Sequence, residues 1–423
     1  MGSLPFSSTR SLLACVLAGI LAQSALLGCG SAADPDAPAP TPSETLPPGS
    51  QPPAATNAPP SGTTTVPPDG PPVTTVRVHY SGSSLPAPLS GATMTLRGST
   101  GPLSWEKSTA FTESKPGLYT WKSSDVKAET ELKPMLGDAW SKGPNYRVQP
   151  NGTIDIYPRF VETKGSVTKK YPSFTSTKLP STRGLWVYLP PTYVENTEAR
   201  FGVLYMHDGQ NLFSPSTAFG GNEWQVDETL DAGAETGVVR EMIVVGVENT
   251  AARIDELTPT SDPGYGGGKA DQYLAMITTE IKPMIDKDLR TKAAREETAI
   301  MGSSLGGLVS AYAGATKADV FGLVGEMSPS TWWDDKVILG EVSGMKAKPV
   351  RPLRIYVDSG DSGNSNDDVV NTTELAARYR GLGYADNKDF KHVVQMGGVH
   401  NEIYWAQRLP AALAFLLGPR ENR

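Results

Sequence analysis

The stretch between residues 298 and 311 constrains the fold of this chain more than any other. An apolar run ends in Gly302-Ser303-Ser304-Leu305-Gly306, and small residues with helical character follow. This order predicts a strand, a sharp turn and a helix, with glycines where strand and helix pass close together. The turn would place the Ser304 hydroxyl at a helix N-terminus, where the dipole favours developing negative charge. The Gly-x-Ser-x-Gly pattern also arises by chance, so the rest of the chain has to support it.

Residues 1–29 have the pattern of an export signal. Arg10 supplies a positive charge, an apolar core spans residues 12–27, and the segment ends in Leu26-Leu27-Gly28-Cys29. The apolar run is shorter than the ~20 residues that span a bilayer. The ending resembles the lipobox of bacterial lipoproteins, which implies lipidation of Cys29 and a membrane anchor, and Gly30 favours the outer membrane or cell surface. The alternative is an ordinary cleaved signal with an incidental cysteine.

Residues 30–75 are rich in Pro, Thr and Ser and predict a disordered tether. Cys15 would leave with the signal, so the mature chain would hold one thiol and no internal disulfide. The net charge is −7, with no basic cluster, no Cys/His metal spacing and no phosphate-binding loop. We therefore expect no nucleic-acid partner, no metal and no cofactor.

Two structural patterns follow the tether. Residues 76–163 alternate polar and apolar side chains between Gly, Pro and Ser turns, which predicts a small all-β sandwich. Residues 164–423 alternate strands with helices, which predicts an α/β domain with a mostly parallel sheet. A serine on a strand-to-helix turn in such a sheet indicates the α/β-hydrolase fold.

The end of the sandwich carries a short resemblance. Residues 132–146 look like starch-binding modules, which implies a carbohydrate-binding-like domain with Trp140, Asn145 and Tyr146 at a sugar-binding edge. The alternative is that Trp105, Trp121 and Trp140 are core residues or pack against the hydrolase.

A catalytic histidine and acid should follow the serine along the chain. Of the four histidines, His400 lies in the loop between the last strand and the last helix, and we predict it to be the general base. The acid should lie in the loop after the strand at residues 353–357. Asp361 is the first choice, Asp367 or Asp368 are possible if the loop folds back, and Asp358 is a structural candidate.

Two backbone N–H groups should form an oxyanion hole. Leu305, directly after the nucleophile, supplies one, and Gln210, beside Gly209 in the loop after the strand at 201–207, supplies the other. Trp332 and Trp333 follow the next strand and either line a substrate pocket or belong to the core.

Together these segments resemble the esterase D / enterochelin esterase superfamily over roughly residues 180–418. The resemblance rests on residues 205–213, 245–250, 301–307, 328–333 and 399–405. It implies a serine esterase with Ser304 and His400 at the family's catalytic positions. The acid loop departs from the family's frequent Gly-x-x-Asp, since Gly363 stands at the fourth place.

The sequence thus predicts an exported serine esterase that acts through an acyl-serine. Its substrate would be a small-molecule or polysaccharide ester, such as an acetyl- or feruloyl-type carbohydrate ester or a siderophore ester. An acyltransferase that uses the same site and a non-catalytic surface-binding lipoprotein are the alternatives.

Overall fold

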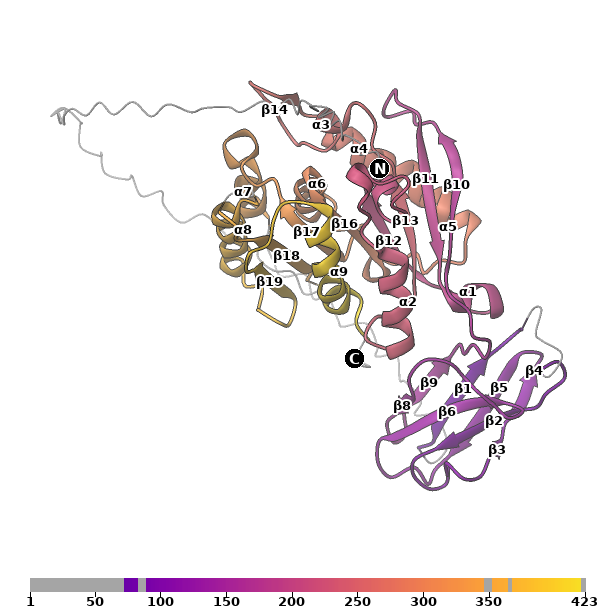
Figure 1. The fold of residues 1–423 in the computed structure, drawn as a ribbon. Coiled ribbons are helices and arrows are strands. Elements are labelled where there is room, and N and C mark those ends of the chain that lie inside the picture. Colours follow the sequence, from indigo (N-terminus) through magenta and orange to yellow (C-terminus); the bar gives the residue numbers. More distant parts are fainter. Residues whose placement is uncertain (1–71, 83–88, 346–351, 364–366, 420–423) are drawn as a thin grey trace, which may run out of the picture. The chain divides into compact units, whose positions relative to one another are not determined.

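An eight-stranded sheet forms the centre of the C-terminal domain in the computed structural model (Figure 1). The structure describes residues 72–82, 89–345, 352–363 and 367–419, so the predicted signal, Cys29 and nearly all of the tether lie outside the described residues. The strands, in spatial order, are β10 (Ser166–Phe174), β11 (Arg183–Leu189), β13 (Met242–Val247), β12 (Gly202–His207), β16 (Thr298–Ser304), β17 (Leu323–Pro329), β18 (Arg354–Gly360) and β19 (Phe390–Gln395). From β13 to β19 all neighbours are parallel, while β10 and β11 are antiparallel. The predicted α/β-hydrolase fold is confirmed.

Helices cover both faces of this sheet because its central strands are apolar on both sides. Neighbouring residues of β12 belong to different cores: Tyr205 packs with one, and Leu204 and Met206 pack with the other. The first core includes α4 (Ala270–Met276), a π-helical turn (Ile277–Ile281), α5 (Lys282–Asp288), α6 (Leu305–Thr316), α7 (Trp333–Gly344) and α8 (Val369–Gly381). The second core is closed by α2 (Val226–Thr236) and α9 (Glu402–Leu417), which lie together on one face in Figure 1.

Shorter elements complete the domain. They are α1 (Pro191–Glu195), η1 (Gly209–Asn211), η2 (Phe219–Gly221), α3 (Arg253–Glu256), η4 (Arg295–Glu297) and a small hairpin of β14 (Ser261–Asp262) and β15 (Gly266–Gly267). Among the described residues, no helix combines the length and apolar character needed to cross a membrane.

Two sheets make up the N-terminal β region. One has the order β4 (Thr112–Lys115), β5 (Leu118–Ser123), β1 (Thr74–His79) and β9 (Thr153–Ile156). The other contains β3 (Thr109–Ala110), β2 (Met94–Gly98), β6 (Thr130–Leu136), β7 (Ala139–Trp140) and β8 (Tyr146–Val148). Both contribute to one apolar core, which includes Val76, Leu96 and Trp121. Trp121, 8% exposed, is therefore a core residue.

The predicted sugar-binding edge is not assembled. Trp140 pairs with Met135, and Tyr146 pairs with Leu132. Met135 and Leu132 are three residues apart on β6, so Trp140 and Tyr146 lie on opposite faces of the sheet. Tyr146 packs against the sandwich core, and Asn145 donates to Glu131 at 3.2 Å. Trp140 stays 38% exposed, with its ring 6.0 Å from that of Trp105.

The β region is hydrogen-bonded to the hydrolase domain through the end of α1. Glu195 is buried and accepts from the Tyr80 hydroxyl at 2.9 Å and from the Phe160 and Val161 N–H groups at 2.7 and 2.9 Å. Arg159 reaches Glu235 near the C-terminal end of α2 at 2.7 Å. These contacts lie at the amino ends of the parallel strands, since α1 follows β11, which runs against them.

Candidate active site

Ser304 occupies a strained turn between β16 and α6. Its backbone has φ 58° and ψ −122°, a conformation that non-glycine residues rarely adopt. A Cβ on Gly302 would lie 2.7 Å from the His207 ring, and one on Gly306 would lie 3.3 Å from the His207 Cβ. A Cβ on Gly302 would also lie 2.9 Å from the backbone of Gly306, so the two glycines let strand and helix approach closely enough to form the turn. The predicted nucleophile elbow is present.

The hydroxyl of Ser304 lies at the carboxyl edge of the sheet. Its Oγ is 3.4 Å from the Oγ of Ser330, which directly follows β17. Leu305 is the first residue of α6, where backbone N–H groups lack partners within the helix. This is the position expected for one donor to an oxyanion.

The loop after β12 is held by an ion pair. Asp208, with φ 55°, accepts from Arg253 at 2.7 and 2.8 Å and from the Asn249 amide at 2.5 Å. Burial alone would raise the pKa of Asp208, but the Arg253 charge and these hydrogen bonds lower it below its ordinary value. Gln210 accepts from the Asn249 N–H through its side chain at 3.2 Å. The predicted second oxyanion residue is thus fixed in a braced loop beside the start of α6, where Gly306 faces Asp208.

His400 is paired with a buried carboxylate. Its Nδ1 lies 2.7 Å from Oδ1 of Asp367, which is 2% exposed. A carboxylate only accepts, so Nδ1 carries the proton and Nε2 is left to act as the base. Burial would raise the pKa of Asp367, but hydrogen bonds from His400, Ser328 and the Gly360 N–H lower it. The Trp405 ring packs edge-on against the imidazole, with centroids 5.0 Å apart.

The first choice for the acid, Asp361, is wrong in this structure, because His400 pairs with Asp367 instead. The Asp361 N–H continues the β18–β19 pairing by donating to Gln395 at 3.1 Å, and its side chain accepts from the Gly397 N–H at 2.6 Å. It therefore braces the loop before His400 from an exposed position. Asp367, six residues further along the chain, is the aspartate that contacts His400. It was one of the alternatives that the sequence left open.

The other two aspartates of this loop have structural partners. Asp358 is fully buried on β18 and accepts from the Ser328 N–H at 3.1 Å. Asp368 precedes α8 and accepts from the Asn371 amide at 2.8 Å.

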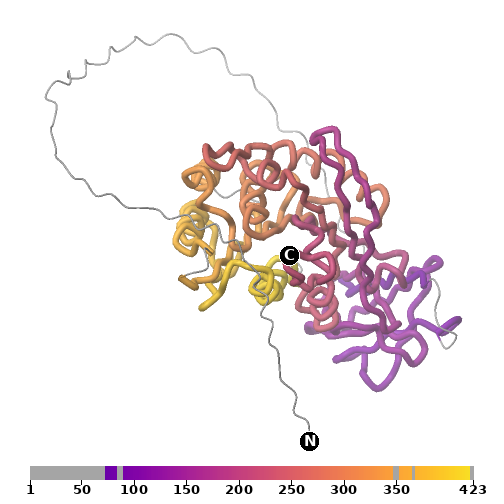
Figure 2. Tube along the Cα trace, turned by 45° about the horizontal axis from the view of Figure 1, so that its top comes forward, coloured from indigo at the N-terminus to yellow at the C-terminus, as the bar shows by residue number. Residues whose placement is uncertain are grey.

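The loops that carry the serine and the histidine meet at the end of β17. Ser330 contacts Ser304, while Ser328 accepts hydrogen bonds from Trp405 and Arg408 of α9 at 3.0 and 2.6 Å. In Figure 2 the orange and yellow segments from β16 to α9 gather on one side of the domain. Adjacent carboxyl ends of parallel strands thus bring together residues that are almost 100 positions apart.

The remaining histidines have other surroundings. His207 is buried beneath the elbow, bonded to the Tyr273 hydroxyl at 2.8 Å, and burial lowers its pKa to about 4. Burial also lowers the pKa of His392 on β19. His79 belongs to the β region and contacts Asp155 at 2.7 Å.

The two neighbouring tryptophans separate into different roles. Trp333 is 1% exposed and donates to the Thr260 carbonyl at 3.1 Å, so it is a core residue and the prediction that it lines a substrate pocket is wrong. Trp332 is 42% exposed, and its ring lies 5.7 Å from that of Tyr265, which is 53% exposed. Tyr265 sits at the tip of the β14–β15 hairpin, and sequence reasoning missed it because an isolated aromatic between glycines carries no periodic signal.

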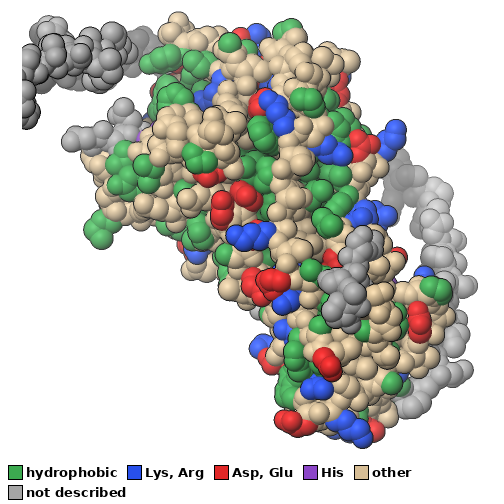
Figure 3. All heavy atoms as spheres, turned by 45° about the vertical axis from the view of Figure 1, so that its right-hand side comes forward, with side chains coloured by type: hydrophobic (Ala, Val, Ile, Leu, Met, Phe, Trp, Pro, Cys, Tyr) green, Lys and Arg blue, Asp and Glu red, His purple; other side chains and the backbone are tan. Residues whose placement is uncertain are grey.

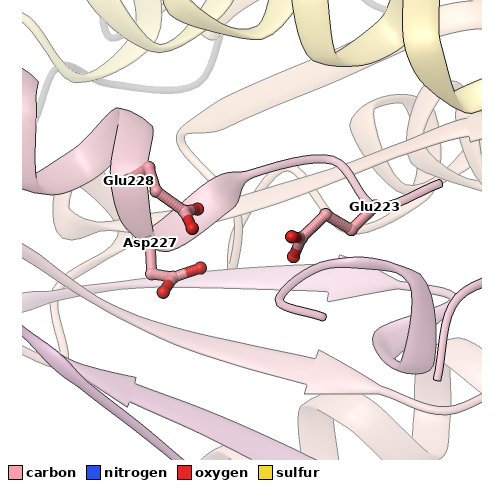
Figure 4. Close-up of side chains that lie close together, drawn as sticks. All are labelled: Glu223, Asp227 and Glu228. Atoms are coloured by element: carbon pink, nitrogen blue, oxygen red, sulfur yellow. The ribbon is translucent and has the colours of Figure 1, made fainter. Parts of the chain in front are cut away.

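One acidic group could offer ligand atoms to a cation. The carboxylates of Glu223, Asp227 and Glu228 lie within 4.8 Å of one another, at the start of α2 and just before it (Figure 4). Burial and Glu228 raise the pKa of Asp227 to about 7. Exposed acidic side chains often cluster without a metal, and Glu228 is exposed. Elsewhere, Figure 3 shows charges of both signs interspersed over the visible face.

A serine on a strained strand-to-helix turn, a histidine paired with a buried aspartate and a parallel sheet define a serine hydrolase of the α/β-hydrolase class. The family model described as "Putative esterase" matches residues 176–416. Because this match covers more than half of the chain, the chain belongs to that family and is a serine esterase, a carboxylic-ester hydrolase.

Three relatives illustrate the range of the family. The chain is 24% identical to the Bacillus subtilis protein YbbA over 252 residues, which cover 57% of this chain and 94% of that protein. It is 29% identical to the siderophore enterobactin esterase of Emericella nidulans over 178 residues, 36% of this chain and 54% of that protein. It is 25% identical to the endo-1,4-beta-xylanase/feruloyl esterase of Xylanibacter ruminicola over 229 residues, 53% of this chain and 28% of that protein.

Proposed function

We propose that this chain is an exported, lipid-anchored esterase that hydrolyses carboxylic esters through an acyl-serine intermediate. The observation that carries the catalytic part is the 2.7 Å pairing of His400 with the buried Asp367, on the same edge of the sheet as the elbow that strains Ser304. A structural histidine in a loop would need neither a buried carboxylate nor a strained serine nearby.

The chemistry follows from these positions. Nε2 of His400 removes the Ser304 proton as Oγ attacks the ester carbonyl, and Asp367 stabilises the imidazolium that forms. The N–H groups of Leu305 and Gln210 stabilise the oxyanion. Collapse of the tetrahedral intermediate breaks the ester bond, and the imidazolium protonates the departing alcohol. Water, activated by the same imidazole, then attacks the acyl-serine and releases the acid. None of these steps uses a metal or a cofactor.

The substrate proposal rests on the exposed aromatic pair. Trp332 follows Ser330 by two residues, and the Ser330 hydroxyl lies 3.4 Å from that of Ser304, so the backbone at Trp332 is close to the loop that borders the nucleophile. Trp332 and Tyr265 offer flat apolar surface to a planar ring or a sugar face. Two relatives are named as a siderophore enterobactin esterase and an endo-1,4-beta-xylanase/feruloyl esterase, and a feruloyl group carries such a planar ring. We propose a feruloyl- or acetyl-type carbohydrate ester, or a siderophore ester, as the substrate.

The anchor proposal rests on the sequence Leu26-Leu27-Gly28-Cys29. Cys29→Ala should move the protein from the membrane fraction of cells to the soluble fraction. Unchanged membrane association of the variant would contradict lipidation at this residue.

A chain that begins at residue 72 is the right soluble form, because a start at residue 76 would cut into β1 (Thr74–His79). A fluorophosphonate probe should label this form and the Ser303→Ala control, and leave Ser304→Ala unlabelled. On a panel of aryl, acetyl-sugar, feruloyl and catecholate esters, the wild type and Ser303→Ala should then hydrolyse the same esters, with a loss of ~10⁴-fold or more in Ser304→Ala.

The same assay separates the alternatives. Release of free acid in the presence of added alcohols supports hydrolysis, whereas transfer of the acyl group to the alcohol would identify an acyltransferase. Equal labelling of both serine variants would contradict the assignment of Ser304, whereas no labelling of the wild type and no turnover of any ester would leave a surface-binding protein.

A further inference from the structure

Arg408 of α9 is a buried arginine that contacts the ends of three strands and one loop near the site. Its side chain is 4% exposed. It lies 3.0 Å from Asp358 and 3.6 Å from Asp367, donates to Ser328 at 2.6 Å and donates to Gln395 at 2.9 Å. These four partners come from the ends of β17, β18 and β19 and from the loop after β18. A planar guanidinium with five donors can hold several acceptors in one fixed geometry.

The contacts of Arg408 surround Asp367 and not the serine. Asp367 shares Arg408 with Asp358, and its other oxygen accepts from His400. Ser328 has φ 38° and connects the two residues, because it accepts from Arg408 and its hydroxyl bonds to Asp367. Gly398, two residues before His400, packs against the guanidinium, since a Cβ there would lie 3.2 Å from it.

The charges of Arg408, Asp358 and Asp367 also affect the proton that His400 takes up. Two buried carboxylates share one guanidinium, and a proton taken up by His400 during catalysis adds a second positive charge to this cluster. Among the described charged groups, Asp367 contacts His400 directly and Glu402 of α9 interacts with it electrostatically, while Arg408 reaches the histidine through Asp367, and Asp358 contacts Arg408. Burial raises the pKa of Asp358 to about 6, and the Arg408 charge opposes that rise.

We propose that Arg408 is a positioning residue for the catalytic pair: its guanidinium fixes Asp367 against His400 and, with Asp358, sets the pH range in which His400 acts as a base. It touches no reacting atom. The inference rests on the proposed function for its kinetic part, while the effect on the His400–Asp367 pair can be measured without turnover.

The kinetic test compares Arg408→Gln and Arg408→Lys in the form that begins at residue 72. In Arg408→Gln, kcat should fall by about 10-fold or more with KM unchanged, because Asp367 is no longer held. The acid limb of the kcat/KM profile should move up by about one pH unit, because a positive charge near the imidazolium is gone. Arg408→Lys keeps the positive charge but loses the planar fork of guanidinium N–H donors. Compared with Arg408→Gln, it should therefore return the acid limb to its wild-type position and recover only part of kcat.

Arg183→Lys is the matched control. Arg183 is also a buried arginine, paired with Glu256 at 2.8 Å, and its hydrogen bonds, ion pair and ring contact with described residues include none of the four partners of Arg408. This variant should lose thermal stability without a change in the acid limb. If Arg408→Gln does not fold, Arg408→Lys decides, because wild-type kcat in that variant would overturn the role of the fork. A folded Arg408→Gln enzyme with wild-type kcat and pH profile would overturn the inference entirely.

A titration by NMR separates this inference from the proposed function. In the Ser304→Ala background, the imidazole of His400 should titrate at higher pH when Arg408→Gln is added, whether or not any ester is hydrolysed. With only four histidines in the chain, the signals can be assigned by substitution. If Arg408→Gln leaves the His400 titration unchanged, Arg408 is merely structural. If the titration moves but the protein with Ser304 intact hydrolyses no ester, the result counts against the esterase proposal alone.

Discussion

At the residue scale, the identity of the catalytic acid depends on which aspartate the backbone turns inward. Asp361 continues the edge of β18 and caps the turn at Gly397. Asp367 is six residues later, yet it is buried, bonded to the Gly360 N–H and paired with His400. Spacing along the chain does not distinguish them, because both follow the same strand.

Asp367→Asn should lower kcat by roughly 10⁴-fold, because the amide no longer holds His400 in the required tautomer. Asp361→Asn keeps an acceptor for Gly397 and should stay within a few-fold of the wild type. Steady-state kinetics on a small aryl ester measures both. A dead Asp361→Asn enzyme beside an active, folded Asp367→Asn enzyme would restore the original choice.

A second residue-scale feature is an acid kept neutral in the core. Glu326 on β17 is 0% exposed and accepts from the Tyr379 hydroxyl at 2.7 Å. Burial raises its pKa from 4.5 to about 8, with the hydrogen bond from Tyr379 opposing the rise. Between these values the folded protein keeps a proton that the unfolded chain releases, so the stability of the fold falls as pH rises.

Glu326→Gln should remove this loss, because the amide stays neutral at every pH. Urea unfolding of the wild type between pH 5 and pH 8 should show a slope of at most roughly 1.4 kcal/mol per pH unit from this group. The variant should show a flatter profile, while the exposed Glu106→Gln should keep the wild-type slope. Parallel profiles for all three proteins would mean that Glu326 is charged in the fold.

At the element scale, the β16–α6 turn depends on space as much as on backbone conformation. The register between β16 and β17 shifts at Ser304, where the strand leaves the sheet. Gly302 faces the His207 ring at this point, and Gly307 faces the carbonyl of Met327, where a Cβ would come within 2.7 Å. The turn therefore requires small residues on strand and helix at once.

Gly302→Ala should destabilise the fold by about 1–3 kcal/mol and lower kcat, because the new Cβ would displace His207 or the start of α6. Gly340→Ala on α7 is the matched control, since a Cβ there meets nothing within 4 Å. It should be neutral or stabilising by up to about 1 kcal/mol. Thermal unfolding and single-ester kinetics test the pair, and a Gly302→Ala enzyme as stable and active as the control would contradict the steric argument.

At the scale of the whole molecule, the β region and the hydrolase domain are packed together. Residues 68–423 form a single compact unit. The bonds of Glu195 and Arg159 lie at the amino ends of the parallel strands, whereas Ser304 and His400 lie at the carboxyl ends. The β region thus stabilises the domain from the edge opposite the site.

Glu195→Ala should lower the melting temperature, because two buried donors and one half-buried donor lose their acceptor, at roughly 1–3 kcal/mol for each buried one. The kcat per folded molecule on a small soluble ester should stay unchanged. Glu198→Ala, an exposed neighbour, should leave both values as in the wild type. A Glu195→Ala enzyme with normal stability would favour a loosely tethered module, which is the arrangement expected of a separate carbohydrate-binding domain.

The sequence by itself determined the fold class and two of the site residues proposed for catalysis. Hydrophobic periodicity and the glycines around Ser304 are local signals, and His400 follows from its place in the last loop before the last helix. Only the tertiary structure decided between Asp361 and Asp367, between core and surface for Trp333 and Trp332, and against the sugar-binding edge of Trp140 and Tyr146. Each of these depends on how a loop folds back or on which face of a strand a side chain occupies. Such contacts join residues far apart in the chain, and no local pattern encodes them.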